Sequence, residues 1–153
     1  MEEKMTDLFS EEWMGALKEV WNYNPQVHKP LQKAKFTARI GYGFKGEPHA
    51  RGMLSIVNGK VQYAGALDDV DVDLDWDLRA SRENWTAWIE SGFGVTKLRP
   101  AIDTNSLEFV KGNYRKMITN LSLGQPFLQH FQLMHKIKIA GNSGTASRIR
   151  SNY

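Results

Sequence analysis

Four aspartates at alternate positions stand in the segment DDVDVDLDWDLRASRENW, residues 68–85, and carboxylates at regular spacing can bind a divalent cation. An EF-hand loop requires glycine at its sixth position and glutamate at its twelfth. A loop that starts at Asp71 has Trp76 and Arg82 there, and a loop that starts at Asp69 fails in the same way. In a strand, side chains at every second position lie about 6.6 Å apart along a line, so these carboxylates do not surround one ion. No metal site is predicted.

The same segment alternates apolar with acidic residues, which is typical of a strand with one buried face. We predict a strand over residues 70–78 whose apolar side chains face the core and whose carboxylates face water. Arg39 and Lys111 on adjacent strands are expected to offset the negative charge. The apolar positions are Val70, Val72, Leu74, Trp76 and Leu78, and the acidic positions are Asp71, Asp73, Asp75 and Asp77.

Three further patterns that could mark a catalytic or cofactor site are incomplete. Residues 41–46, GYGFKG, have the G-x-G-x-x-G spacing of a phosphate-binding loop, but Glu47 and Pro48 follow where that loop needs a helix, so we interpret them as a glycine-rich turn. His130 and His135 lie about 140° apart around a helix and do not converge on one ligand. No G-x-S-x-G nucleophile elbow is present. We therefore expect no catalytic residue and no cofactor, in a protein that is not an enzyme.

The composition fits one cytoplasmic domain. A chain of 153 residues is long enough for one domain with a core, and the absence of cysteine suits a reducing compartment. The N-terminus has no apolar leader, and no window reaches the roughly 18 apolar residues of a membrane span. We expect a soluble, unexported protein.

The net charge of +3 does not indicate nucleic-acid binding, because it comes from the C-terminal end. Residues 136–153 contain four basic and no acidic side chains, which leaves 16 basic and 17 acidic residues in positions 1–135. We divide the chain into a domain over residues 1–137 and a flexible basic tail over residues 138–153. The alternative role of the tail is a transient contact with an anionic membrane or a partner enzyme.

Capping residues and apolar periodicity predict four amphipathic helices. Ser10, Ser81 and Asn113 are expected to cap the first three. The last helix has Leu128 and Leu133 beside its main apolar stripe, which is enough apolar width for the domain and for a second contact. The stripe consists of Phe127, Phe131, Met134 and Ile137.

Prolines and glycines are expected to separate these elements. Pro25 and Pro30 bracket a predicted loop, residues 98–102 form a predicted connection, and residues 124–126, Gly-Gln-Pro, are expected to end the third helix.

Period-two patterns predict the remaining strands, one from Lys35 and one near Phe109. Asn58 and Gly59 are predicted to form a type I′ hairpin turn, which pairs Ile56 with Val61 and Leu54 with Tyr63. The order of elements predicts an α+β fold. Its sheet is five-stranded and mainly antiparallel, with the first strands in a meander and helices packed on one face.

The C-terminal half is rich in large apolar side chains, which either form an ordinary core or enclose an apolar cavity. Methionine and phenylalanine adapt to ligands of varied shape, so we infer a cavity for hydrophobic ligands. The predicted lipid-binding residues are Trp76, Trp85, Trp88, Ile89, Phe93, Phe109, Met117, Phe127, Phe131 and Met134.

Two segments resemble the sterol carrier protein 2 (SCP2-like) lipid-binding domains. Residues 75–81, DWDLRAS, with Glu83 and Trp85 behind them, are similar to a strand of that family that reads A-D-V-T-L-R-A-S before a capped helix. LEFVKGN, residues 107–113, is similar to a later strand that ends in Gly-Asp or Gly-Asn. The resemblance covers residues 8–134, although the loop over residues 91–105 lacks the family's aspartate before proline and its glycine before the fifth strand.

The resemblance implies a hydrophobic tunnel between sheet and helices that holds sterols, fatty acids or fatty acyl-CoA, with the C-terminal helix as its cover. The expected function is that of a non-catalytic carrier for an apolar small molecule. The alternative is an accessory module that presents a hydrophobic or CoA-thioester substrate to a partner enzyme. A third possibility is an interaction domain with a filled core.

Overall fold

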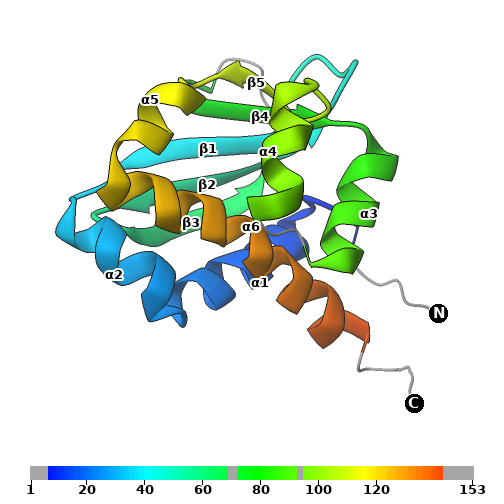
Figure 1. Ribbon diagram of the computed structural model, residues 1–153. Coiled ribbons are helices and arrows are strands. Elements are labelled where there is room, and N and C mark those ends of the chain that lie inside the picture. Colours follow the sequence, from blue (N-terminus) through cyan, green and yellow to red (C-terminus); the bar gives the residue numbers. More distant parts are fainter. Residues whose placement is uncertain (1–6, 69–71, 93–94, 143–153) are drawn as a thin grey trace.

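The computed structural model describes residues 7–68, 72–92 and 95–142 and shows an α+β fold with helices on one face of a sheet (Figure 1). The helices are α1 Glu11–Asn22, α2 Pro25–Lys33, α3 Arg82–Ser91, α4 Val95–Asp103, α5 Tyr114–Thr119 and α6 Leu121–Asn142. The strands are β1 Ala38–Phe44, β2 Gly52–Val57, β3 Lys60–Ala66, β4 Trp76–Ala80 and β5 Glu108–Lys111, in the sheet order β3-β2-β1-β4-β5. The predicted fold class, with its five mainly antiparallel strands, is confirmed.

The fourth strand does not continue the meander. Strand β4 pairs with β1 in parallel, on the side of β1 opposite to β2. The outer edge of β3 is occupied by side chains of α1, because Asn22 bonds both the N–H and the carbonyl of Val61 at 3.0 Å and Glu11 accepts from Ala66 N–H at 3.0 Å. With the β3 edge covered, the free edge of β1 is where β4 adds to the sheet.

The β2–β3 hairpin turns where the sequence predicts. Asn58 and Gly59 both have positive φ, at 49° and 84°, and Ile56 lies opposite Val61. A register shift then places Leu54 opposite Ala64, so the predicted pairing of Leu54 with Tyr63 is wrong. The extra residue of this bulge is invisible to a two-residue periodicity.

The three predicted N-caps are confirmed. Ser10 Oγ accepts from Trp13 N–H at 3.2 Å, Ser81 Oγ from Asn84 N–H at 3.0 Å, and Asn113 Oδ1 from Lys116 N–H at 2.9 Å.

The proline signals misplace three boundaries. Pro25 begins α2 at a position where no N–H is needed, and Pro30, Pro100 and Pro126 are each the sixth residue of a helix. A proline at that position removes one backbone hydrogen bond, and the fully buried neighbours Leu31, Leu98 and Phe127 offset the loss. The predicted loop, the predicted connection and the predicted break are therefore all helical, and the chain turns at Asn120 instead.

The aspartate segment is only partly the strand that its alternation predicts. Strand β4 begins at Trp76, and Leu74 belongs to a small apolar cluster with Ala50 and Leu67, apart from the main core. Asp77 is only 8% exposed and forms an ion pair with Arg79. The prediction that all four carboxylates face water is therefore wrong at Asp77.

The other aspartates follow the prediction as far as they are described. The side chain of Asp73 is 90% exposed and pairs with Lys111 at 3.4 Å, as expected. Asp75 accepts from the backbone N–H of Arg39 at 2.9 Å, while Val70 and Asp71 lie outside the described residues.

Gly41 and Gly43 of GYGFKG are part of strand β1, so their interpretation as a turn is wrong, whereas Gly46 lies in a turn with a φ of 89°. A Cβ at Gly41 would lie 2.5 Å from Leu74 Cδ1, and a Cβ at Gly43 would lie 2.9 Å from Ala50 Cα. These glycines let two loops pack directly on the face of the sheet away from the helices.

The space between sheet and helices is filled by side chains of the chain itself. Fully buried residues from both layers meet there, and a continuous tunnel is not seen among the described residues. Leu128 and Leu133, expected to serve a second contact, are also buried, at 7% and 5% exposure. The largest of the buried side chains are Trp21, Trp85, Tyr42, Phe9, Phe127 and Phe131.

In the part of the chain that the structure covers, no helix has the length and apolarity to cross a membrane. Helix α6 continues to Asn142, past the predicted domain boundary at residue 137.

The ion pair of Asp77 gives a stability test that separates it from its neighbours in sequence. Asp77→Asn leaves a buried guanidinium without its countercharge, so we expect the free energy of unfolding in urea to fall by about 3 kcal/mol. Asp73→Asn removes an exposed charge and is expected to change it by less than about 0.5 kcal/mol. Equal effects of the two variants would contradict the buried position of Asp77.

Candidate ligand-binding groove

The described structure has an open groove of about 1200 Å³ between α4, β5 and α5. Helices α4 and α5 flank the β5 end of the sheet (Figure 1). The wall of the groove combines side chains from both helices and from the start of β5, and the apolar ones are Pro100, Ile102, Leu107, Phe109, Tyr114 and Ile118.

Aromatic contacts connect this wall to the core. The ring centroid of Phe109 lies 5.4 Å from that of Tyr114 and 5.9 Å from that of Trp76, and Trp76 lies 4.9 Å from Phe127. Leu107 is buried, and its N–H donates to the carbonyl of Ala101 at 2.9 Å, which fixes α4 against the strand. The wall is therefore packed directly against the core.

The rim of the groove is polar and contains two cations, Arg99 and Arg115. Both are exposed, and neither forms an ion pair with another described residue. Asp103 is the one acid among the described lining residues, so the lining has a net positive charge. Lys45 Nζ donates to the carbonyl of Asn105 and connects the rim to the end of β1.

One polar atom lies inside the apolar wall. The hydroxyl oxygen of Tyr114 is buried and has no hydrogen-bond partner among the described residues. An unpaired buried hydroxyl costs about 1–3 kcal/mol.

Of the ten predicted lipid-binding residues, only Phe109 lines this groove. Trp76 contacts it through Phe109, and Trp88 is half-buried beside Trp85 with ring centroids 5.8 Å apart. Phe93 lies outside the described residues. The other members are core residues, namely Trp85, Ile89, Met117, Phe127, Phe131 and Met134.

Sequence reasoning missed most of the groove because it treated residues 98–102 as a connection. Leu98, Ala101 and Ile102 have the i, i+3, i+4 spacing of a helix, and this signal was available despite Pro100. Arg99 and Arg115 are ordinary surface arginines in the sequence, and only the tertiary structure brings them to one rim.

Within the described residues, no three histidine, aspartate or glutamate side chains gather as metal ligands. The groove therefore offers apolar contact, hydrogen bonds and charge.

No protein-family model matches the sequence, and no curated protein matches it. The crystal structure of sterol carrier protein 2 is similar, with a TM-score of 0.68 at 16% identity, over 85% of this chain and 98% of that one. This chain has the fold of sterol carrier protein 2.

Two further structures share the SCP2-like fold. A solution structure from Thermus thermophilus, described as possibly sterol carrier protein, has a TM-score of 0.62 at 18% identity, over 88% of this chain and 90% of that one. A structure described as the UbiJ-SCP2 ubiquinone synthesis protein has a TM-score of 0.50 at 14% identity, over 79% and 90% of the two chains.

In this version of the SCP2-like fold, a buried polar pair joins the long helix to the sheet. The hydroxyl of Tyr42 on β1 donates to His130 Nε2 on α6 at 2.8 Å, and His130 Nδ1–H donates to the carbonyl of Phe127. Both side chains are fully buried. Burial lowers the pKa of His130 to about 4 and raises that of Tyr42 well above its usual range, so both groups are neutral at pH 7.

The His130 pair predicts a loss of stability in acid. The pKa is 6.5 for an ordinary histidine and about 4 in the folded protein, so the unfolded chain binds more protons between these values. Stability therefore decreases as the pH falls from 6.5 to 4, by about 3 kcal/mol in total from this residue. Urea unfolding at a series of pH values would measure it.

His130→Gln is expected to flatten this part of the pH profile relative to wild type. His28→Gln is the matched variant, because His28 is also buried and its pKa is also lowered, chiefly by desolvation. This variant leaves His130 in place, so its free energy of unfolding should still decrease as the pH falls. If the stability of wild type and of His130→Gln fell in parallel as the pH decreased, the buried imidazole would not be the cause of the loss of stability in acid.

Proposed function

We propose that the protein is a non-catalytic binding protein for a lipid or another largely apolar small molecule, held in the groove between α4, β5 and α5. The observation that carries the proposal is the group of apolar side chains that line that groove. Its volume, about 1200 Å³, is slightly above the roughly 300–1,000 Å³ that is usual for small-molecule sites. The SCP2-like fold supports the same class of ligand.

The apolar wall can supply the affinity without a covalent step. Burying about 16 methylenes at ~0.8 kcal/mol each contributes roughly 13 kcal/mol before ordering costs. A micromolar complex requires about 8 kcal/mol, so full burial of such a chain would leave about 5 kcal/mol to offset the ordering costs.

The rim supports an amphipathic ligand with an anionic end. Arg99 and Arg115 lie at the mouth of the groove, while Ile102, Phe109 and Ile118 form its interior. An acyl chain on the apolar wall would leave a carboxylate or phosphate near the two guanidinium groups, which bind such oxyanions in bidentate geometry.

A second candidate function is the presentation of such a ligand to a partner enzyme. The groove is open along one side, so a partner could reach a bound molecule without removing it. The similarity to a structure described as a ubiquinone synthesis protein favours this possibility. Copurification with an enzyme, and loss of that enzyme's activity when this chain is deleted, would separate it from independent transport.

The apolar wall predicts a matched pair of variants. Ile118→Asp places a charge in the groove and is expected to weaken binding of a fluorescent long-chain fatty acid at least about tenfold. Val110→Asp is the control, because Val110 is 51% exposed and does not line the groove. Circular dichroism would confirm that both variants fold, and mass spectrometry of extracts would report copurified lipid. The proposed function would be contradicted if the wild type showed no saturable binding of the fatty acid, or if both variants bound it equally well.

The rim predicts a charge preference. Arg115→Gln is expected to weaken the binding of a fatty acid about threefold to fivefold, because an exposed ion pair contributes up to about 1 kcal/mol. The binding of the fatty alcohol of equal length should not change. Lys116→Gln changes the same charge at the next position, which does not line the groove. Competition against the fluorescent probe gives the six affinities, of the acid and the alcohol for wild type and both variants. Identical losses for acid and alcohol would mean that Arg115 does not bind the head group.

A further inference from the structure

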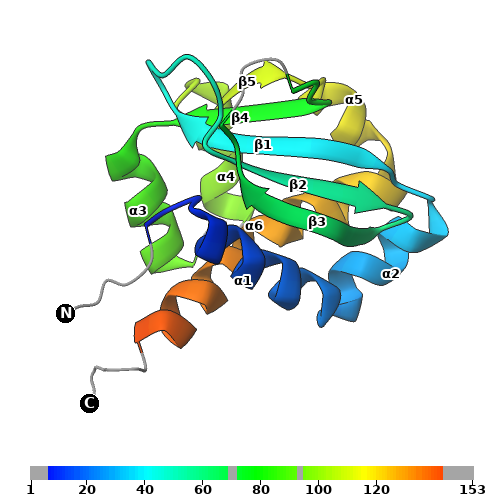
Figure 2. The same ribbon diagram turned by 180° about the vertical axis from the view of Figure 1, so that it is seen from behind.

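The face of the sheet away from the helices, seen in Figure 2, holds a second and separate cavity. Its volume is about 110 Å³, and it lies where two loops cover strands β1 and β4. It exists because Gly41 and Gly43 let Leu74 and Ala50 lie against the backbone of β1. The lining residues are Pro48, His49, Ala50, Leu67, Val72, Leu74, Asp77, Arg79 and Lys111.

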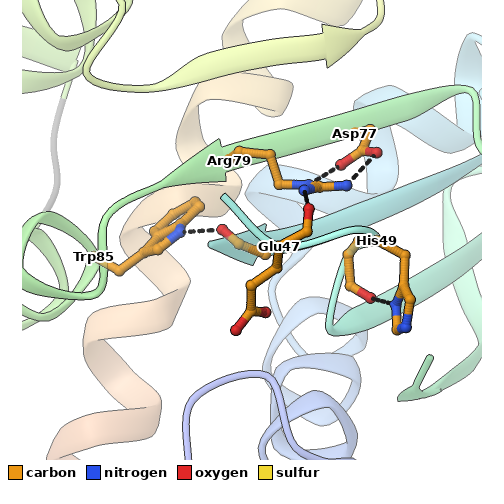
Figure 3. A network of polar contacts seen from close by, with 7 residues as sticks. Glu47, His49, Asp77, Arg79 and Trp85 are labelled. Carbon is orange, nitrogen blue, oxygen red and sulfur yellow. Dashed lines mark hydrogen bonds and ion pairs between the residues drawn. The ribbon is translucent and has the colours of Figure 1, made fainter. Parts of the chain in front are cut away.

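A buried arginine forms the polar side of this cavity (Figure 3). Arg79 is only 7% exposed and donates from Nε and Nη2 to the two oxygens of Asp77 at 2.6 and 3.0 Å. Its Nη1 donates to the carbonyl of Glu47 at 3.0 Å. A guanidinium has five N–H donors, so two of them have no partner among the described residues. Buried donors of a charged group are costly to leave unpaired.

The charge of the lining favours an anion. Asp77 and Arg79 neutralise each other, and Lys111 adds one positive charge. The ion pair of Lys111 is with the highly exposed Asp73 at 3.4 Å, and such pairs contribute little. His49 donates from Nδ1 to the carbonyl of Ala50 at 2.7 Å, so its ring is fixed at the border of the cavity (Figure 3).

The other side of the cavity is apolar and limits the size of an occupant. Ala50, Leu67 and Leu74 form a buried cluster with Val72 packed against it. A volume of about 110 Å³ equals roughly four water molecules at their liquid volume of about 30 Å³ each. A molecule with a short apolar tail and one oxyanion fits both the size and the two kinds of wall, whereas a long-chain lipid does not.

We propose that this cavity binds a small carboxylate anion, with the carboxylate at Arg79 and Lys111 and a short alkyl group against Leu67 and Leu74. The site lies on the opposite face of the sheet from the groove, so it is independent of the proposed lipid-binding function. A protein that binds no lipid could still bind the carboxylate here, and the reverse also holds.

Propionate is a suitable probe, and its neutral analogue propionamide has a similar shape. We expect propionate, added to the ¹⁵N-labelled protein at constant ionic strength, to shift the backbone amide signals of Gly41, Gly43 and Ala50 along a saturable curve. Lys111→Gln is expected to raise the dissociation constant about fivefold. Lys116→Gln lies outside the cavity and is expected to leave it unchanged.

Propionamide should bind more weakly than propionate by at least the factor lost in Lys111→Gln. The proposal is overturned if propionate produces no saturable shift at these glycines, if propionamide binds as tightly, or if Lys116→Gln weakens binding as much as Lys111→Gln. Both lysines are exposed, so their variants should remain folded, and the unshifted signals of the helices provide the check on folding.

Discussion

Strand β1 lies at the centre of the sheet and is covered on both faces. The rest of the structure depends on which side chains it presents to each face. Toward the helices it presents Ile40, Tyr42 and Phe44, which pack into the main core. Toward the other face it presents Gly41 and Gly43, whose missing side chains let loops lie on the sheet. Large apolar residues on one face and two glycines on the other thus turn a single strand into the centre of two compartments.

The two compartments differ in how they are filled. Between sheet and helices the rings of Trp85, Phe127 and Phe131 occupy the interior, and the Tyr42–His130 hydrogen bond connects helix to strand at the centre. Among the described residues, the groove lies where the layers separate at the sheet edge, beside the short strand β5. The proposed ligand at this edge would meet a wall packed against the core and a rim of exposed side chains.

Local signals predicted much of the fold. Caps, periodicity and the Asn58-Gly59 turn depend on a few neighbouring residues, so Ser10, Ser81 and Asn113 each begin a helix as expected. The prolines led to wrong helix boundaries, because a helix tolerates the loss of one hydrogen bond when residues near the proline are buried. The candidate site was harder to predict, because both core and groove recruit large apolar residues. Composition therefore could not distinguish Phe131, which is buried, from Phe109, which lines the groove.

The aspartate segment shows which features the local sequence determines and which depend on the tertiary structure. By itself the sequence determined that an α+β fold with a half-buried strand near Trp76 would form, because alternation and capping are properties of adjacent residues. Only the tertiary structure decided that Asp77 is buried against Arg79 while Asp73 stays in water. The physical reason is that burial depends on what covers a side chain, and the loops that cover Asp77 come from other parts of the chain. The same reason places Arg99 and Arg115 at one rim although nothing in their local sequence connects them.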